Sequence, residues 1–223
     1  WIYNAGAWRQ VLVPGPPPRA NATLTYDPLR ARVVLATGSD GTQTFADTWE
    51  FDGEHWAQRF PAQSPPALSG AALAFDSVRR RGVLFGGALQ SGAPSAETWE
   101  WDGVVWTQRT PTMHPPAAGR FVYDSQRGVC VLVNNSGTWE WNGTDWSHAL
   151  PATLPPTRYF PVMTFDGTRT ILFGGGVQVV GTVLLAALAC WLAGLGWHES
   201  LFLGFLLSLS STAASTKMLV DHG

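Results

Sequence analysis

Four aspartates recur at one position of a repeated pattern, and they are the carboxylates best placed to do chemistry. Each follows an aromatic residue, in the pairs Tyr26-Asp27, Phe75-Asp76, Tyr123-Asp124 and Phe165-Asp166. Carboxylates at one level of a repeated fold could form a ring. However, an aspartate in this position commonly caps a turn through its side chain. We therefore expect turn capping for all four.

Tryptophan is the second side chain that recurs. The motif W-E-[FW]-[DN]-G-x-x-W occupies residues 49–56, 99–106 and 139–146, and a degenerate copy occupies residues 1–8. Alternation along a strand places the first and third residues of each motif on one face. The rings could form a platform for sugars, but we expect structural core between neighbouring repeats. The positions concerned are Trp49, Trp56, Trp99, Trp106, Trp139 and Trp146.

Successive motifs begin 48, 50 and 40 residues apart, and the same elements follow each of them. These are a proline pair, the aromatic-aspartate pair and an apolar run, which twice ends in a diglycine, Gly86-Gly87 and Gly174-Gly175. Short apolar runs bounded by Gly, Pro, Asn and Asp predict β-strands, and the Asp-Gly or Asn-Gly of the motif predicts a hairpin. This period is typical of a β-propeller blade. We expect a mainly β domain over residues 1–176, with three full blades and two half blades.

The diglycine after an apolar strand, the later aromatic residue and the spaced tryptophan pair resemble kelch repeats. The closest version is the W-E-W-D-G-x-x-W form of bacterial, galactose oxidase-like proteins, and the resemblance covers about residues 1–175. It implies a partial propeller whose inter-strand loops bind a protein or a glycan. Trp101-Asp102 also resembles the WD40 dipeptide, but the period near 50 residues and the diglycines favour kelch.

Some propellers of this kind are copper oxidases, which need convergent His, Tyr and Cys ligands. His55, His114 and His148 lie at different offsets within their repeats. We therefore expect no catalytic residues, no cofactor and no metal site.

Composition excludes further functions. The formal net charge is −2, and the largest basic cluster is the triplet at residues 79–81, so we expect no nucleic-acid partner. Cys130 and Cys190 lie in apolar runs, which argues against a disulfide framework. Because the sequence begins at Trp1 rather than Met, we expect the natural N-terminus to lie upstream.

The sequence changes character after residue 176. Residues 177–197 carry no charge, and as a helix they match the thickness of a bilayer core at about 1.5 Å per residue. A polar break at 198–199 precedes a second candidate span, 200–220. We therefore expect a two-helix transmembrane hairpin over residues 177–223. A buried helix of a soluble domain is the alternative for the first segment.

The second span is rich in hydroxyls, which can support locally unwound backbone beside an ion pathway or simply bond within a helical anchor. The run LFLGFLLSLSSTA at 201–213 resembles the monovalent cation:proton antiporter-2 family, and the resemblance covers residues 177–223. It implies that Ser210, Ser211 and Thr212 would lie at the broken crossover of a transport core, with a monovalent cation and a proton as cargo. The acidic ion-binding residue should lie on the next helix, and two helices cannot form an alternating-access transporter, so we expect no transport by this chain alone.

Three hypotheses follow. The first is a membrane-attached kelch-type propeller that binds a protein or a glycan. The second is an antiporter fragment, for potassium or sodium, that carries unrelated sequence upstream through an accidental or artefactual fusion. The third is a propeller enzyme, which the sequence supports least. In each case the membrane resemblance favours a bacterial inner membrane, and the side on which the propeller lies stays open.

Overall fold

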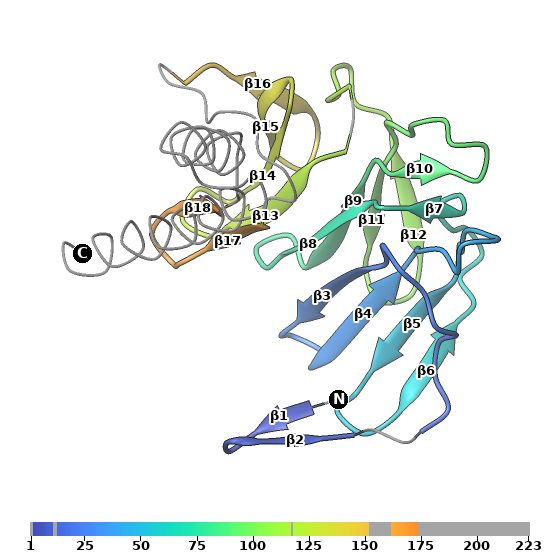
Figure 1. Cartoon of the computed structure of the whole chain (residues 1–223). Coiled ribbons are helices and arrows are strands. Elements are labelled where there is room, and N and C mark those ends of the chain that lie inside the picture. The colour runs from blue at the N-terminus through green and yellow to red at the C-terminus, as the bar shows by residue number, and fades with distance from the viewer. Residues whose placement is uncertain (1, 11–12, 117, 152–161, 174–223) are drawn as a thin grey trace, which may run out of the picture. The chain divides into compact units, whose positions relative to one another are not determined.

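The computed structural model describes residues 2–10, 13–116, 118–151 and 162–173, and Figure 1 shows their arrangement. These residues form eighteen short strands, and the described ranges contain no helix. Every pairing whose register is determined is antiparallel. The mainly β prediction is therefore confirmed. The predicted transmembrane hairpin lies outside the described residues, and within them no helix is long and apolar enough to cross a bilayer.

Three four-stranded sheets follow one another along the chain, and each pairs its strands in sequence order. The first sheet consists of β3 (Thr23–Asp27), β4 (Arg32–Ala36), β5 (Thr48–Phe51) and β6 (Trp56–Arg59). The second sheet consists of β8 (Ala72–Asp76), β9 (Arg81–Phe85), β11 (Thr98–Trp101) and β12 (Trp106–Arg109). The third sheet consists of β13 (Arg120–Asp124), β14 (Val129–Asn134), β15 (Gly137–Trp141) and β16 (Trp146–Ala149).

Three smaller sheets have two strands each. The motif copy at the start forms β1 (Ile2–Asn4) and β2 (Ala7–Arg9), and the last aromatic-aspartate segment forms β17 (Val162–Phe165) and β18 (Thr170–Phe173). These pairs correspond to the predicted half repeats. The third pair, β7 (Leu68–Ser69) with β10 (Ala88–Leu89), was not predicted. The propeller arrangement of the sheets stays a prediction.

The four recurring aspartates cap turns, as predicted. Asp27 Oδ1 accepts hydrogen bonds from the backbone N–H groups of Leu29 and Arg30, at 3.0 and 3.2 Å. Asp76, Asp124 and Asp166 each accept the same two bonds from the residues two and three positions later. Aspartate therefore recurs because the backbone N–H groups of these turns need a side-chain acceptor.

The hairpins inside the three full motifs are also confirmed. Asp52 Oδ1 accepts from the backbone N–H groups of Glu54 and His55, and Gly53 has a φ of 104°. Asp102-Gly103 and Asn142-Gly143 repeat this geometry. Glycine is favoured there because positive φ is costly for residues with a Cβ atom.

The third motif follows the second after only 40 residues because the connection before β15 is short. In the first two sheets, residues 37–47 and 86–97 connect the second strand to the third. In the third sheet, Asn134 pairs directly with Gly137, so only two residues connect β14 to β15. This explains the drop in repeat length from 50 to 40 residues.

The diglycine at Gly86-Gly87 serves close packing as well as backbone conformation. Both residues have positive φ, 71° and 98°. A Cβ on Gly86 would lie 2.8 Å from the Cβ of Ala118, and one on Gly87 would lie 3.0 Å from the backbone nitrogen of Ala71. The second diglycine, Gly174-Gly175, lies outside the described residues.

Two apolar clusters fill the spaces between consecutive sheets. The first contains Val34 and Ala36 of the first sheet together with Leu73, Trp99, Trp101 and Trp106 of the second. The second contains Ala74, Val83 and Phe85 of the second sheet together with Trp139, Trp141 and Trp146 of the third. The first strands of consecutive sheets also contact each other, β3 with β8 and β8 with β13. The second sheet therefore uses one face for the first sheet and the other for the third.

Candidate functional site

The tryptophan motif divides its side chains between the two faces of a strand. In β5, Thr48 and Glu50 lie on one face and Trp49 and Phe51 on the other, because side chains alternate along a strand. β11 has the same division, with Thr98 and Glu100 opposite Trp99 and Trp101. The threonine and glutamate of each strand are buried, although charged residues are rarely buried without a partner.

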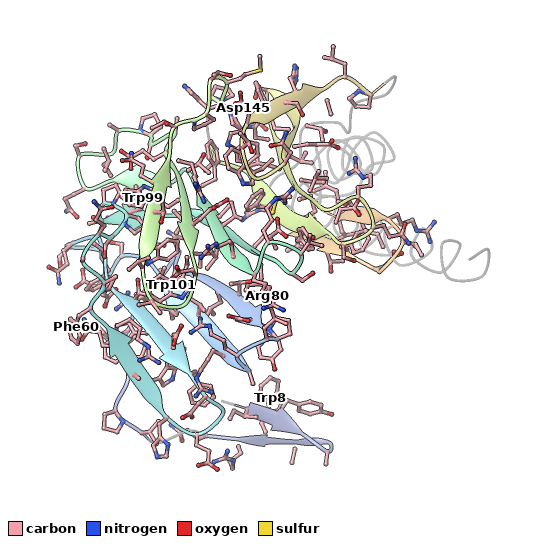
Figure 2. The ribbon with its side chains drawn as sticks, turned by 180° about the vertical axis from the view of Figure 1, so that it is seen from behind. Trp8, Phe60, Arg80, Trp99, Trp101 and Asp145 are labelled. Carbon is pink, nitrogen blue, oxygen red and sulfur yellow. The ribbon has the colours of Figure 1, made fainter. Side chains whose placement is uncertain are left out.

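Their partners are the indoles of the next sheet. Trp101 Nε1 donates to Glu50 Oε1 at 3.2 Å, and Trp106 Nε1 donates to Thr48 Oγ1 at 2.8 Å. The same two bonds recur one repeat later, from Trp141 Nε1 to Glu100 Oε1 at 3.2 Å and from Trp146 Nε1 to Thr98 Oγ1 at 2.9 Å. Figure 2 shows Trp99 and Trp101 extending from β11. At each of these two junctions, one pair of indoles thus donates hydrogen bonds to one threonine–glutamate pair.

Arginines neutralise the buried carboxylates. Arg30 Nη2 donates to Glu50 Oε1 at 2.6 Å, and Arg59 Nε donates to Glu50 Oε2 at 2.8 Å. Burial by itself would raise the pKa of Glu50, but the hydrogen bonds and charge of Arg30, with bonds from Trp101 and Arg59, lower its pKa overall. Arg109 plays the corresponding role for Glu100, at 2.5 and 2.8 Å. The lowered pKa holds Glu50 as a carboxylate that accepts hydrogen bonds, and Glu100 accepts both bonds from Arg109 through Oε2.

The turn-capping aspartates connect to this network through the arginine three residues later. Arg30 Nε donates to Asp27 Oδ2 at 2.7 Å, so one guanidinium bonds both Asp27 and Glu50. Arg127 bonds Asp124 and Glu140 in the same way, at 2.7 and 2.6 Å. Arg79 bonds Asp76 and the backbone oxygen of Gly128, which belongs to the next sheet. The recurring aspartates thus anchor arginines at the sheet junctions.

The six predicted structural tryptophans divide into two groups. Trp99, Trp106, Trp139 and Trp146 are buried in the two clusters, which agrees with the predicted core role. Trp49 and Trp56, in the first sheet, are only half-buried. Trp49 Nε1 donates to Asp47 Oδ2 at 2.7 Å, as Trp99 Nε1 donates to Glu97. The transport-core candidates Ser210, Ser211 and Thr212 lie outside the described residues.

The histidines lie apart from any shared site in the described part of the chain. His55 lies in the β5–β6 turn, and His148 stacks on Trp139 with ring centroids 4.6 Å apart. His114 Nδ1 lies 3.1 Å from its neighbour's carbonyl oxygen. Among the described residues, no group of three or more His, Cys, Asp or Glu side chains could hold a metal ion. Burial raises the pKa of the Cys130 thiol well above its ordinary value.

The sequence prediction missed the glutamate of the motif. The signal was present, because Glu50, Glu100 and Glu140 each follow a tryptophan inside an apolar strand. A charged residue at that position indicates a specific buried partner. The recurrence of tryptophan does not by itself specify which acceptors the indole N–H groups reach.

The third sheet carries the same acceptors in a more open setting. Thr138 and Glu140 occupy the positions of Thr48 and Glu50. The Glu140 side chain is 24% exposed, against 1% for Glu50 and 3% for Glu100. Within the residues that the structure describes, no indole donates to Thr138 or Glu140.

Compared with known proteins, the sequence matches no family model, and no curated protein is significantly similar to it.

Proposed function

We propose that residues 1–175 form part of a kelch-type β-propeller that binds a protein or a glycan, attached to a membrane by residues 177–223. The observation that carries the propeller proposal is the recurrence of one junction. Trp101 and Trp106 bond Glu50 and Thr48 just as Trp141 and Trp146 bond Glu100 and Thr98. Sheets joined repeatedly by one contact are expected in a radial array of blades.

The surface we assign to the partner is the edge that carries the long inter-strand loops. These loops, at residues 37–47 and 86–97, follow β4 and β9 at the same end of their sheets. Gln90 links the two loops by hydrogen bonds: its Oε1 accepts a bond from the backbone N–H of Thr44 at 2.5 Å, and its Nε2 donates to the backbone oxygen of Thr42 at 2.9 Å. Adjacent loops that bond to each other supply a continuous polar surface, on which function is commonly found.

A binding screen tests this assignment. The full chain, in detergent micelles, is exposed to immobilised glycans and folded protein domains. We expect that Thr42→Asp and Gln90→Asp reduce binding of any ligand at least about tenfold, while Thr144→Asp, on the turn at the opposite edge, leaves it unchanged. Absence of any ligand, or equal loss in all three variants, would contradict the proposal.

Membrane attachment has its own test. We expect the chain to stay in the membrane fraction after an alkaline wash, because two apolar spans insert stably into a bilayer. Release of the chain into the supernatant would contradict the anchor.

The run at 201–213 supports a second candidate, in which residues 177–223 derive from a cation:proton antiporter and the repeats are joined to them accidentally. A genomic read across codons 165–185 separates the two candidates. One continuous locus supports the membrane-attached propeller, whereas two separate loci support the accidental join.

A further inference from the structure

The hairpin between β15 and β16 carries the one asparagine of the sequence that precedes a glycine, Asn142-Gly143. Asn142 is exposed and lies in the turn that links Trp141 to Trp146. Because glycine has no Cβ atom, its backbone nitrogen can approach the side-chain carbonyl carbon of the preceding residue with little hindrance. The pair therefore has the composition for an attack by a backbone nitrogen on a side-chain amide.

The turn polarises the side-chain amide of Asn142. Asn142 Oδ1 accepts hydrogen bonds from the backbone N–H groups of Thr144 and Asp145, at 2.8 and 2.9 Å. Two donors on a carbonyl oxygen draw electron density from its carbon, and they stabilise the negative charge that develops on the oxygen when a nucleophile adds. The folded turn thus supplies a stabilisation that a flexible peptide would first have to organise.

A guanidinium from the second sheet lies beside the attacking nitrogen. Gly143 packs so closely on Arg79 that a Cβ at this position would overlap the arginine side chain. Hydrogen bonds to Asp76 and to the backbone oxygen of Gly128 hold Arg79 in place. A cation next to the Gly143 nitrogen favours the loss of its proton, because it stabilises the anion that forms.

We propose that Asn142 is a site of spontaneous deamidation in the folded chain. The Gly143 nitrogen loses its proton to solvent and attacks Asn142 Cγ. The bond from Cγ to Nδ2 then breaks, and ammonia leaves with a proton taken from water. Water opens the resulting succinimide at either carbonyl carbon and yields aspartate or isoaspartate, so the net reaction consumes one water and releases one ammonia without a redox step.

The two products have different consequences for the junction with the second sheet. Aspartate is the residue that the other two full motifs carry, at Asp52 and Asp102. Isoaspartate routes the backbone through the side-chain carbon and lengthens the turn between Trp141 and Trp146, whose indoles donate across the junction. Isoaspartate should therefore loosen this junction. The inference does not depend on ring closure, on the loop-edge ligand or on the membrane anchor, so it can hold or fail without them.

Incubation of the full chain in detergent micelles and mildly alkaline buffer tests the site. Peptide mass spectrometry locates the exchange of NH2 for OH, and fragmentation separates aspartate from isoaspartate. A synthetic peptide with the sequence of residues 137–149 is the control without the fold. We expect Asn142 to convert at least about tenfold faster in the folded chain than in the peptide, which is less than one oxyanion donor contributes inside an enzyme because this turn is exposed.

The other two motifs supply matched variants. Asp102→Asn places an amide before Gly103, where the turn donates two bonds and Arg30 packs on the glycine. Asp52→Asn also has two turn bonds, but Gly53 has open space around it. We expect Asp102→Asn to deamidate at its own position about threefold faster than Asp52→Asn, because an exposed charge contributes modestly.

The outcomes separate the parts of the inference. Conversion of Asn142 no faster in the folded chain than in the peptide would overturn the site. Equal rates in Asp52→Asn and Asp102→Asn would overturn the role of the arginine. A chain enriched in isoaspartate should unfold at a lower urea concentration than Asn142→Asp, and equal midpoints would overturn the effect on the junction.

Discussion

The bond between Trp106 and Thr48 gives the most direct measure of how the first two sheets are held together. Both residues are about 1% exposed, and Trp106 Nε1 lies 2.8 Å from Thr48 Oγ1. Thr48→Val removes the acceptor but keeps the branched shape, so it leaves a buried indole N–H without a partner. An unsatisfied buried donor costs about 1–3 kcal/mol in the free energy of unfolding. We expect a loss in that range.

A double-mutant cycle isolates the bond from packing. Trp106→Phe removes the donor and part of the ring, and we expect it to cost about 2 kcal/mol or more because a small cavity remains. When both changes are combined, neither a donor nor an acceptor is left unpaired. We therefore expect the double variant to lose about 1 kcal/mol less than the two single variants together.

The assay is urea unfolding of the full chain in mild detergent, followed by tryptophan fluorescence. Thr107→Val, on the exposed face of β12, serves as the surface control and should change stability by no more than about 0.5 kcal/mol. The cycle is repeated on Thr98 and Trp146, whose bond is 2.9 Å long. A coupling near zero at both pairs, or a Thr48→Val effect no larger than the control, would refute the role of these bonds.

Three further predictions concern charge, backbone and sulfur. The pKa of Glu50 is lowered in the folded state, so its contribution to stability is complete above the unfolded pKa and is lost as the pH falls through the folded pKa. Unfolding measured as a function of pH should therefore show decreasing stability below about pH 4.5. The decrease should be shallower in Glu50→Gln. Gly86→Ala should destabilise the fold by about 2 kcal/mol in the same urea assay, because Gly86 has positive φ and lies close to Ala118. Gly92 also has positive φ but has open space around it, so Gly92→Ala should cost only about 1 kcal/mol. In a Cys190→Ser background, Cys130 should react with iodoacetamide only after unfolding, because its thiol is buried and its pKa is raised; rapid labelling of the native chain, measured by mass spectrometry, would contradict this.

Much of the local structure could be predicted from the sequence. The Asp-Gly and Asn-Gly hairpins, the capping role of Asp27 and its equivalents, and the strand runs all depend on interactions within a few residues. Burial of Trp99 and Trp139 also followed from the strand period and the repetition. The transmembrane prediction for residues 177–223 stays a prediction.

The candidate site was predicted only in part, because the sequence singled out the donors and not the acceptors. Glu50 and Glu100 were not predicted as acceptors, although a carboxylate within an apolar strand needs a partner. The exposure of Glu140 also had no local signal. Its motif is as complete as that of Glu100, but Ala149 stands where Arg59 and Arg109 bond the other two glutamates, and the Glu140 side chain is 24% exposed.

The sequence by itself determined the strands, the turns and the repeat, since these depend on backbone conformation and on side chains close in the chain. Only the tertiary structure decided which face of each strand meets which neighbour. The bonds from indoles to threonine and glutamate join residues 41 to 58 positions apart, so no local preference specifies them. They form because one sheet buries its carboxylate against the indoles of the next sheet, and each buried polar group there needs a hydrogen-bond partner.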